Sequence, residues 1–417
     1  MAENKGILVV GGGISGMTVA VEAAEVGYDV SLVERNPYLG GRVAQLNKYF
    51  PKLCPPYCGM EINFRRIRPN PAIKVMTMTE VTKVEGTPGN FTVTLKTSPR
   101  DVNENCTGCN KCAEACPNER PDAFNYGMGK TKASYIPHIL SFPMRYVIDK
   151  SACTGDFGKA CKEACKYDAV ELDMQPETKT ITVGSVVYAT GWKPYDMANL
   201  SILGEGKLKN VISNVMMERL ASPGGPTAGK ILRPSDGKEA KNIGFVQCAG
   251  SRDENHLSQC STICCMASIK QAFYVREQYP EDSKAEIFYI DLRTPGRYEK
   301  FLNRAEADPN IVFTKGKVAK VAEDPETGDV TVELEDVFGG GKRQATVDML
   351  VLATGMEPEL KASGLPAGLS AEGFAVADLQ KPGIFSAGVA KAPVDVMTSI
   401  QDATGVALKA IQAIARS

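Results

Sequence analysis

The first 34 residues read as a complete βαβ unit, which constrains the fold more than any other stretch of the chain. Residues 6–34 open with the β-branched run GILVV, turn at Gly11, Gly13 and Gly16, and continue through a helical stretch to an apolar run ending at Glu34. Glycines at this spacing let backbone N–H groups approach a pyrophosphate at a helix N-terminus, and an acidic residue about twenty positions later can accept ribose hydroxyls. Because strand, helix, spacing and acid agree, the sequence predicts an α/β dinucleotide-binding domain rather than an accidental cluster of glycines.

A second glycine pair favours FAD over NAD. Gly40, Gly41 and Arg42, in ERNPYLGGRVA, resemble the second glycine pair of the two-dinucleotide-binding-domain flavoproteins. The ATG segments at 189–191 and 353–355 resemble the strands that close each nucleotide domain in that superfamily. The resemblance, rather than spacing alone, therefore implies a thioredoxin-reductase-like flavoprotein.

The C-terminal stretch supplies a third piece of this resemblance. GIFSAGV, residues 383–389, looks like the strand that ends beside the flavin ribityl chain, although Val389 stands where an acidic residue is usual. Residues 393–414 read as a helix whose N-terminus could favour an anionic reduced flavin, and the alternative is a helix that only packs. The predicted FAD contacts are Gly11, Gly13, Ser15, Gly16, Glu34, Arg35, Gly41, Arg42, Val81, Ala189, Thr190, Gly191, Gly388, Val389 and Val396.

An iron–sulfur signature interrupts this domain. CTGCNKCAEACP runs from Cys106 to Pro117 with the spacing C-x2-C-x2-C-x3-C-P, which places three thiolates on one 4Fe–4S cluster and sends the fourth to another. A structural zinc site is the alternative. Zinc sites normally use separated cysteine or Cys/His pairs, and the nearest histidine is His138, so the spacing favours the cluster.

The second half of this insert is one cysteine short. It contains Cys153, Cys161 and Cys165, and Asp156 stands where a fourth thiolate would be expected. In crossed ligation, the last cysteine of each half binds the cluster of the other half, which predicts two sets of ligands. The first set is Cys106, Cys109, Cys112 and Cys165, and the second is Cys116, Cys153 and Cys161. The second set could hold a cluster with an Asp or non-protein fourth ligand, or a three-iron cluster; alternatively, this half has lost its metal.

A further cysteine array lies where a pyridine-nucleotide enzyme would carry another glycine loop. The apolar run NIGFVQ is followed by Cys248, Cys260, Cys264 and Cys265, spaced C-x11-C-x3-C-C. Four thiolates in eighteen residues can ligate a 4Fe–4S cluster. A redox disulfide between the two vicinal cysteines and a set of buried, unreactive cysteines are the alternatives. The missing phosphate loop argues against oxidation of NAD(P)H.

These landmarks predict a flavin domain divided by two insertions. Its parts are residues 1–100, 167–195 and 340–417. Residues 101–166 form the predicted ferredoxin-like insert, and residues 196–339 form a second nucleotide-binding-like domain.

Composition supports an ordinary globular chain in a reducing compartment. The 417 residues are 43% hydrophobic and 23% charged, and the net charge of −1 predicts no nucleic-acid partner. The sequence contains no long apolar run or cleavage site, so we expect neither a membrane span nor a signal peptide. The thirteen cysteines cluster like metal ligands rather than a disulfide framework. Cys54 and Cys58 fit a ligand to a partner's cluster, a redox pair or structural cysteines equally well.

With these motifs in place, nearly the whole chain resembles the heterodisulfide reductase A-subunit family. The resemblance rests on GGGISG, LGGR, FPKLCPPYC, PGNFTV, CTGCNKCAEACP and QCAGSRDENHLSQCSTICCMASIKQA. The last motif is associated in that family with a cluster close to FAD, so the resemblance implies that Cys248, Cys260, Cys264 and Cys265 are cluster ligands.

The sequence reads as a compact form, without the extra N-terminal domain and the second ferredoxin module of full-length members. This form is most similar to the A-subunit of the quinone-interacting membrane-bound oxidoreductase (Qmo) complex of sulfate reducers. That resemblance implies a cytoplasmic electron-transfer subunit with FAD and iron–sulfur clusters, peripheral to the inner membrane, that passes electrons between menaquinol and adenylylsulfate reductase. Its implied partners are a paralogous subunit with flavin and iron–sulfur clusters, and a haem-containing membrane subunit.

Three other functions stay open at this point. The first is the A-subunit of a soluble, electron-bifurcating heterodisulfide reductase. The second is an NAD(P)H-dependent flavin oxidoreductase like the small subunit of glutamate synthase, and the third is a scaffold without redox activity. The sequence contains no acid–base dyad or nucleophile–base pair that we can name, so the predicted site residues bind cofactors and none is predicted to be catalytic.

Overall fold

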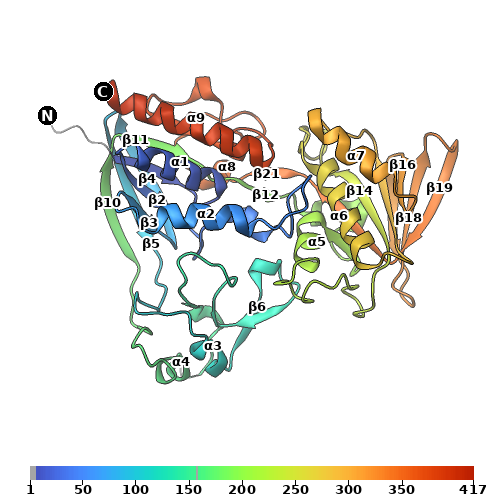
Figure 1. The fold of residues 1–417 in the computed structure, drawn as a ribbon, viewed down its shortest axis with the longest axis horizontal. Helices are drawn as coiled ribbons and strands as arrows, with labels where there is room; N and C mark the ends of the chain where they lie inside the picture. The colour runs from blue at the N-terminus through green and yellow to red at the C-terminus, as the bar shows by residue number, and fades with distance from the viewer. Residues whose placement is uncertain (1–5, 156–157) are drawn as a thin grey trace. The chain divides into compact units, whose positions relative to one another are not determined.

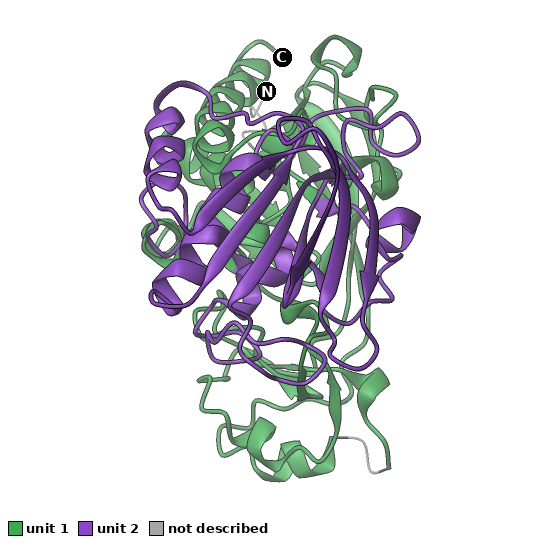
Figure 2. Cartoon of the chain, turned by 90° about the vertical axis from the view of Figure 1, so that its right-hand side faces the viewer, with its two compact units in different colours: residues 1–44, 57–192, 358–417 green, residues 45–56, 193–357 purple. Residues whose placement is uncertain are grey.

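The computed structural model describes residues 6–155 and 158–417. Asp156, proposed above for the position of the missing thiolate, lies outside the described residues. The chain divides into two compact units (Figure 2). Unit 1 comprises residues 1–44, 57–192 and 358–417, and unit 2 comprises residues 45–56 and 193–357.

Unit 1 is built on a five-stranded parallel sheet with the strand order β22-β11-β1-β2-β3. Its strands are β1 (Gly6–Val10), β2 (Asp29–Val33), β3 (Ile73–Met76), β11 (Ser185–Tyr188) and β22 (Ile384–Ser386). The central strands are rich in valine, isoleucine and leucine because both faces of a parallel sheet are covered. The predicted βαβ unit is confirmed: Glu34 directly follows β2.

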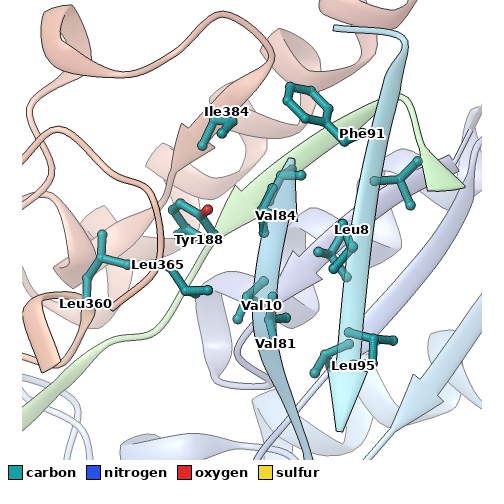
Figure 3. Close-up of a cluster of buried hydrophobic side chains, with 14 of the residues drawn as sticks. Leu8, Val10, Val81, Val84, Phe91, Leu95, Tyr188, Leu360, Leu365 and Ile384 are labelled. Atoms are coloured by element: carbon teal, nitrogen blue, oxygen red, sulfur yellow. The ribbon is translucent and has the colours of Figure 1, made fainter. Parts of the chain in front are cut away.

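An antiparallel sheet covers one face of this parallel sheet. Its strands are β4 (Thr79–Thr87), β5 (Asn90–Thr97) and β10 (Glu177–Val183), in the order β10-β5-β4. Leu8 and Val10 of β1 pack in one buried cluster with Val81, Phe91 and Leu95 (Figure 3). Side chains alternate along a strand, so the neighbouring residues of β1 are directed to the opposite face.

Helices pack on that opposite face. α1 (Ile14–Glu25) lies beside α9 (Val396–Ala415), and α2 (Tyr57–Ile67) lies next to α1 (Figure 1). The short helix α8 (Leu360–Ser363) also belongs to unit 1. None of the described helices combines the length and apolarity that crossing a bilayer requires.

The cysteine-rich insert is part of unit 1 and has a small core of its own. Its described residues form two short α-helices and two pairs of short antiparallel strands. These are α3 (Lys111–Ala115), α4 (Lys159–Glu163), β6 (Glu119–Pro121), β7 (Lys130–Lys132), β8 (Ser134–Tyr135) and β9 (Val147–Ile148). Buried cysteines pack there with Val102, Tyr146, Ala169 and Val170, so the core extends past the expected boundary at residue 166.

Unit 2 repeats the plan of a parallel sheet covered by an antiparallel one. The parallel strands, in the order β13-β20-β14-β15-β16, are β13 (Val211–Ser213), β20 (Met349–Thr354), β14 (Asn242–Ala249), β15 (Lys284–Tyr289) and β16 (Ile311–Lys315). The antiparallel strands are β17 (Val318–Glu323), β18 (Val330–Asp336) and β19 (Gly341–Val347), and the helices are α5 (Asn214–Leu220), α6 (Cys264–Gln278) and α7 (Glu299–Glu306). The chain passes between the units in β12 (Trp192–Pro194) and β21 (Met356–Pro358).

Two of the domain boundaries expected from the sequence differ from those of the structure. Residues 340–357, expected to open the last part of the flavin domain, belong to unit 2, because β19 pairs with β18 and β20 lies between β13 and β14. Residues 45–56, expected in the first domain, also belong to unit 2. The second ATG segment therefore lies at the end of β20, an interior strand of the parallel sheet of unit 2.

Candidate functional site: a glycine loop and three cysteine groups

Two glycines bring β1, α1 and the first ATG segment into close contact. Gly11 has a φ of +109°, and a Cβ atom there would overlap the carbonyl oxygen of Ala189. A Cβ atom at Gly16 would overlap the carbonyl oxygen of Gly11. Both positions therefore require glycine, because any side chain would clash with the backbone of the protein itself.

Gly13 differs, because the space beside it is open. It is the N-cap residue of α1, and no side chain of the described residues caps this helix. A Cβ atom at Gly13 would have the Cα atom of Gly41, 3.9 Å away, as its nearest neighbour. The second glycine pair thus lies against the first loop, and the amide of Gly40 donates to the carbonyl of Gly12 at 2.8 Å. An uncapped helix N-terminus beside an open, side-chain-free turn fits the pyrophosphate of a dinucleotide.

Glu34 is buried and faces the glycine loop. Its Oε2 accepts from the amide of Gly12 at 2.7 Å, and its Oε1 accepts from the backbone and side-chain nitrogens of Asn36 at 2.7 and 2.8 Å. Burial raises the pKa of this carboxyl above its ordinary value, although these three donors oppose the shift. Glu34 therefore fixes the conformation of the loop, and its contact with ribose hydroxyls stays a prediction.

Arg35 and Arg42, two predicted cofactor contacts, both lie near the carboxylate of Glu359, a residue that the sequence did not indicate. Arg35 forms an ion pair of 2.5 Å with Glu359, and Arg42 lies 3.8 Å from the same side chain. Arg42 also donates to the backbone oxygen of Trp192 at 3.1 Å and to the hydroxyl of Tyr126 at 3.2 Å. Arg42 thus connects the LGGR stretch to the cysteine-rich insert and to the residue after the first ATG segment.

Thr190, in the first ATG segment, carries a buried hydroxyl. Its Oγ1 is shielded from solvent and has no hydrogen-bond partner among the described residues. Such a group normally has a partner, because leaving it unpaired costs about 1–3 kcal/mol. Gly191 follows with a φ of +70°. The unpaired hydroxyl fits a hydrogen bond to a bound cofactor.

The C-terminal contacts lie around the first turns of α9. Gly388 has a φ of +61° and packs against the Ser15 side chain, while Val389 is buried. The amide of Gly388 donates to Asp402 Oδ2 at 2.8 Å, so α9 supplies an acidic group near the position where Val389 replaces the usual acid. This role of Asp402 could not be read from the sequence, because the residue lies thirteen positions beyond Val389.

The N-terminus of α9 already has a protein partner. Val396 is its first residue, and the side chain of Asp395 accepts from the amide of Thr398 at 2.7 Å. The Asp395 carboxylate therefore offsets part of the positive partial charge at the N-terminus of α9. This is the charge that we expected to act on the flavin. Val81, another predicted contact, has its side chain in the hydrophobic core of unit 1.

The structure brings together the four cysteines predicted for the first cluster. Cys106, Cys109 and Cys112 line one pocket with Cys165, which comes from the other half of the insert, and Tyr146 and Tyr167 complete its wall. The amide of Ala169 donates a hydrogen bond to Cys165 Sγ at 3.4 Å. Four thiols from two distant segments around one pocket fit the crossed ligation of a cluster.

The three cysteines of the second set also lie near one another. Burial raises the pKa of Cys161 to about 12, and the neighbouring Cys116 and Cys112 add to the effect. Burial likewise raises the pKa of Cys153, with a further contribution from Cys116. Cys116 and Cys161 are buried and Cys153 is half-buried. A metal centre bound by these thiolates would compensate their negative charge.

The third group lies at the carboxyl end of β14, at the N-terminus of α6. Cys248 is on β14 with a φ of +55°, Cys260 lies in the following loop, and Cys264 and Cys265 begin α6. Burial raises the pKa of Cys264 far above its ordinary value, and the other three cysteines contribute to the shift. In open α/β sheets, ligands bind outside the carboxyl ends of the strands, where a nucleotide domain carries its phosphate loop. Unit 2 has four cysteines at this position.

The arrangement of these thiols is not that of a site for a single metal ion. Among the described residues, no group of three or more His, Cys, Asp or Glu side chains could hold a metal ion. The ligands of an iron–sulfur cube need not converge in that way, because each thiolate binds a different iron. Cys54 and Cys58 are exposed free thiols, and each of the three interpretations given above stays open for them.

Comparisons with known proteins agree with this geometry. Residues 9–69 match the model of an NAD(P)-binding Rossmann-like domain. Thioredoxin reductases of Lactococcus lactis and T. acidophilum superpose with TM-scores of 0.56 and 0.54 at 14% and 15% identity. They cover 99% and 98% of this chain, and this chain covers 99% and 96% of theirs. At this identity the likeness concerns the fold alone, and it confirms the predicted thioredoxin-reductase-like α/β fold.

Sequence relatives are considerably closer. The chain is 38% identical over 423 residues to the second iron–sulfur A-subunit of the CoB–CoM heterodisulfide reductase of Methanopyrus kandleri. It is 37% identical over 418 residues to the A-subunit of the H(2):CoB–CoM heterodisulfide,ferredoxin reductase of Methanothermobacter marburgensis. These matches cover 98% and 97% of this chain but only 64% and 63% of the relatives' own lengths. Over this shared length, the chain is similar to the A-subunits of heterodisulfide reductases.

Proposed function

We propose that the chain is an electron-transfer subunit with FAD and iron–sulfur clusters in a larger redox complex. The observation that carries this proposal is the pocket formed by Cys106, Cys109, Cys112 and Cys165. Thiols from both halves of the insert meet there, as crossed cluster ligation requires. A set of structural cysteines would not need to meet around one pocket.

FAD would bind at the glycine loop of unit 1. The N-terminus of α1 and the open space beside Gly13 would receive the pyrophosphate, and the hydroxyl of Thr190 would donate a hydrogen bond to the cofactor. Flavin exchanges two electrons with one partner and single electrons with clusters. Arg42, through its contacts with Tyr126 and Trp192, would hold the flavin loop against the insert.

Three groups of cysteines would hold the clusters. Cys106, Cys109, Cys112 and Cys165 would ligate the first, and Cys248, Cys260, Cys264 and Cys265 would ligate one in unit 2. Cys116, Cys153 and Cys161 would ligate another whose fourth ligand is not a cysteine of this set. These clusters would pass single electrons between the flavin and partner subunits.

The partners that we propose are the other subunits of a quinone-interacting membrane-bound oxidoreductase complex. They include a paralogous subunit with flavin and iron–sulfur clusters, and a haem-containing membrane subunit. Electrons would move between menaquinol and adenylylsulfate reductase. The chain would then lie at the cytoplasmic side of the inner membrane, attached through those subunits. The sequence resemblance described above supports this assignment.

The second candidate is a soluble, electron-bifurcating heterodisulfide reductase. The names of the relatives favour it, since they describe reductases of the CoB–CoM heterodisulfide. Purification of the complex from its native host distinguishes the two candidates. A co-purifying haem-containing membrane subunit would support the quinone-linked complex, whereas co-purifying hydrogenase subunits would support the bifurcating enzyme.

The proposed cofactors are tested on the chain itself. Anaerobically purified protein should contain about eleven or twelve irons per FAD, as expected for three clusters. NADH should leave the flavin absorbance unchanged, because unit 2 has cysteines where the nucleotide loop would lie. About four irons per FAD with rapid bleaching by NADH would instead identify a nucleotide-dependent flavoenzyme.

A further inference from the structure

The loop between Cys248 and Cys260 is folded back on itself so that its two ends approach each other. Ser251 forms a bridge with Leu257, and the amide of Asp253 donates to the carbonyl of Leu257 at 3.1 Å. The amide of Arg252 donates to the carbonyl of Gln259 at 3.2 Å. This closed loop returns the chain to the carboxyl end of β14 and fixes the backbone of Arg252 beside the cysteine array.

The guanidinium group of Arg252 is directed at that array. Its Nη1 lies 4.0 Å from Cys248 Sγ as a hydrogen-bond donor, and its Nη2 donates to Asp291 Oδ2 at 2.7 Å. Asp291 follows β15, and its backbone oxygen lies 3.6 Å from Cys265 Sγ. Asp291 therefore anchors the arginine through its side chain and contacts a second cysteine through its backbone. The Arg252 side chain is 23% exposed, so solvent screens its charge only in part.

Arg252 and Arg293 are cationic side chains that act on Cys248. Burial raises the pKa of this thiol, and the positive charges of Arg252 and Arg293 oppose the rise. Asp291 is the acidic side chain paired with Arg252, and Lys315 and Arg293 also act on Asp291. The two arginines thus favour negative charge at the Cys248 sulfur, whereas burial, the larger effect, disfavours it.

We propose that Arg252 is a positioning residue that raises the reduction potential of the cluster held by Cys248, Cys260, Cys264 and Cys265. This inference rests on the proposed function. A cluster becomes more negative when it gains an electron, and its potential depends on net charge, on hydrogen bonds to the sulfurs and on solvent exposure. Arg252 supplies both a charge and a hydrogen bond at one ligand sulfur, so it stabilises the reduced state more than the oxidised state.

The experiment is a redox titration of the purified, cluster-containing protein, monitored by electron paramagnetic resonance. The transition of this cluster is identified as the one that Cys248→Ala abolishes. Arg252→Gln should shift that transition to more negative potential and leave the other transitions and the iron content unchanged. Arg252→Lys keeps the charge but loses the fixed donor geometry, so its shift should be smaller.

Lys241→Gln is the matched control. Lys241 is also in unit 2, pairs with Asp282 at 2.8 Å and precedes β14, at the opposite end of the strand from Cys248. The substitution removes the same charge at a distance from the cysteines, so its titration should coincide with that of the parent. Equal shifts in the Lys241 and Arg252 variants, or no shift in either, would overturn the inference.

The iron content of the Arg252 variants and of Cys248→Ala distinguishes the tuning role of Arg252 from the assignment of the cluster itself. If both Arg252 variants lost about four irons per chain, Arg252 would be needed for assembly, and the tuning role would be wrong while the cluster assignment stood. If Cys248→Ala changed neither the iron content nor any transition, the array would hold no cluster and both proposals would fall at this site.

Discussion

Lys270 and Glu218 form an ion pair of 2.9 Å inside unit 2, where their side chains are only 3% and 4% exposed. Glu218 also accepts from the amide of Asn47 at 2.9 Å, and Lys270 donates to the carbonyl of Lys48 at 2.7 Å. A buried ion pair needs such additional hydrogen bonds to offset the loss of solvation. The pair therefore fixes residues 45–56 against helices α5 and α6 rather than merely joining those two helices.

Replacing Lys270 with methionine should destabilise unit 2 strongly. Glu218 would keep its carboxylate in the interior without the cation, and breaking a buried pair from one side costs about 3–5 kcal/mol. The free energy of unfolding, measured by urea denaturation, should fall by this amount.

Lys241→Gln serves as the control for this change. The Lys241–Asp282 pair is largely exposed, with side chains 35% and 59% accessible, and exposed pairs contribute about 0–1 kcal/mol. A loss of stability in the Lys270 variant no larger than in the Lys241 variant would contradict the role assigned to the buried pair.

The same pair explains why one domain boundary could not be predicted. Residues 45–56 follow the LGGR stretch directly, so the sequence places them with the first domain. The groups that hold them in unit 2, Glu218 and Lys270, lie more than 170 residues away in sequence. No local pattern encodes such a contact. By contrast, the βαβ unit was predictable because its glycines, strands and acidic residue lie within one short segment.

Gly13→Ala should weaken FAD binding while the protein folds normally. Alanine is compatible with the backbone of Gly13, whose φ of −73° and ψ of −175° are extended, and the space beside it is open. A methyl group would fill the space proposed for the pyrophosphate. We expect the Kd for FAD to rise about tenfold or more, equivalent to about 1.4 kcal/mol, as measured by flavin fluorescence titration of the apo-protein.

Gly405→Ala is the matched control for Gly13→Ala. Gly405 lies in the interior of α9, and an added Cβ atom there would meet no neighbour within 4 Å. Alanine should stabilise the helix by about 0.5–1 kcal/mol and leave FAD affinity unchanged. Unchanged affinity in the Gly13 variant would show that the pyrophosphate does not bind at this turn.

Cys165→Ala should remove the same cluster as Cys106→Ala, although the two residues belong to different halves of the insert. Both line the pocket that also contains Cys109 and Cys112. Iron and acid-labile sulfide analysis should show a loss of about four irons in each single variant and no larger loss in the double variant. Cys54→Ala, which alters an exposed thiol, should lose none. Additive losses from Cys106 and Cys165 would mean that the two residues serve different clusters.

For the cysteines, the sequence predicts the ligand sets but not the residues that contact them. The spacing C-x2-C-x2-C-x3-C-P was enough to predict which thiols should meet, because crossed ligation is a property of that motif. The residues that act on them were not predictable. Arg252 approaches Cys248 only because a loop closes between Ser251 and Leu257, and Asp291 reaches Arg252 from the end of another strand. Such tuning groups depend on tertiary folding and have no fixed spacing.

Thr190→Val tests the unpaired hydroxyl in the first ATG segment. The Oγ1 atom is buried without a hydrogen-bond partner among the described residues, so its loss should stabilise the apo-protein by about 1 kcal/mol or leave it unchanged. If the hydroxyl bonds to FAD, the same change should raise the Kd for FAD about three- to tenfold, because one net hydrogen bond contributes about 0.5–1.5 kcal/mol.

Thr354→Val, at the corresponding position of the second ATG segment, should behave in the opposite way. Thr354 Oγ1 already donates to Asn214 Oδ1 at 3.2 Å in the interior of unit 2. Its loss should cost about 1 kcal/mol of stability, seen in urea denaturation, without changing FAD affinity. The two substitutions are chemically identical. Opposite effects on stability and FAD affinity would therefore show that the Thr190 hydroxyl binds the cofactor and that the Thr354 hydroxyl stabilises the fold. Equal FAD affinities in the Thr190 variant and the parent would remove Thr190 from the proposed cofactor site.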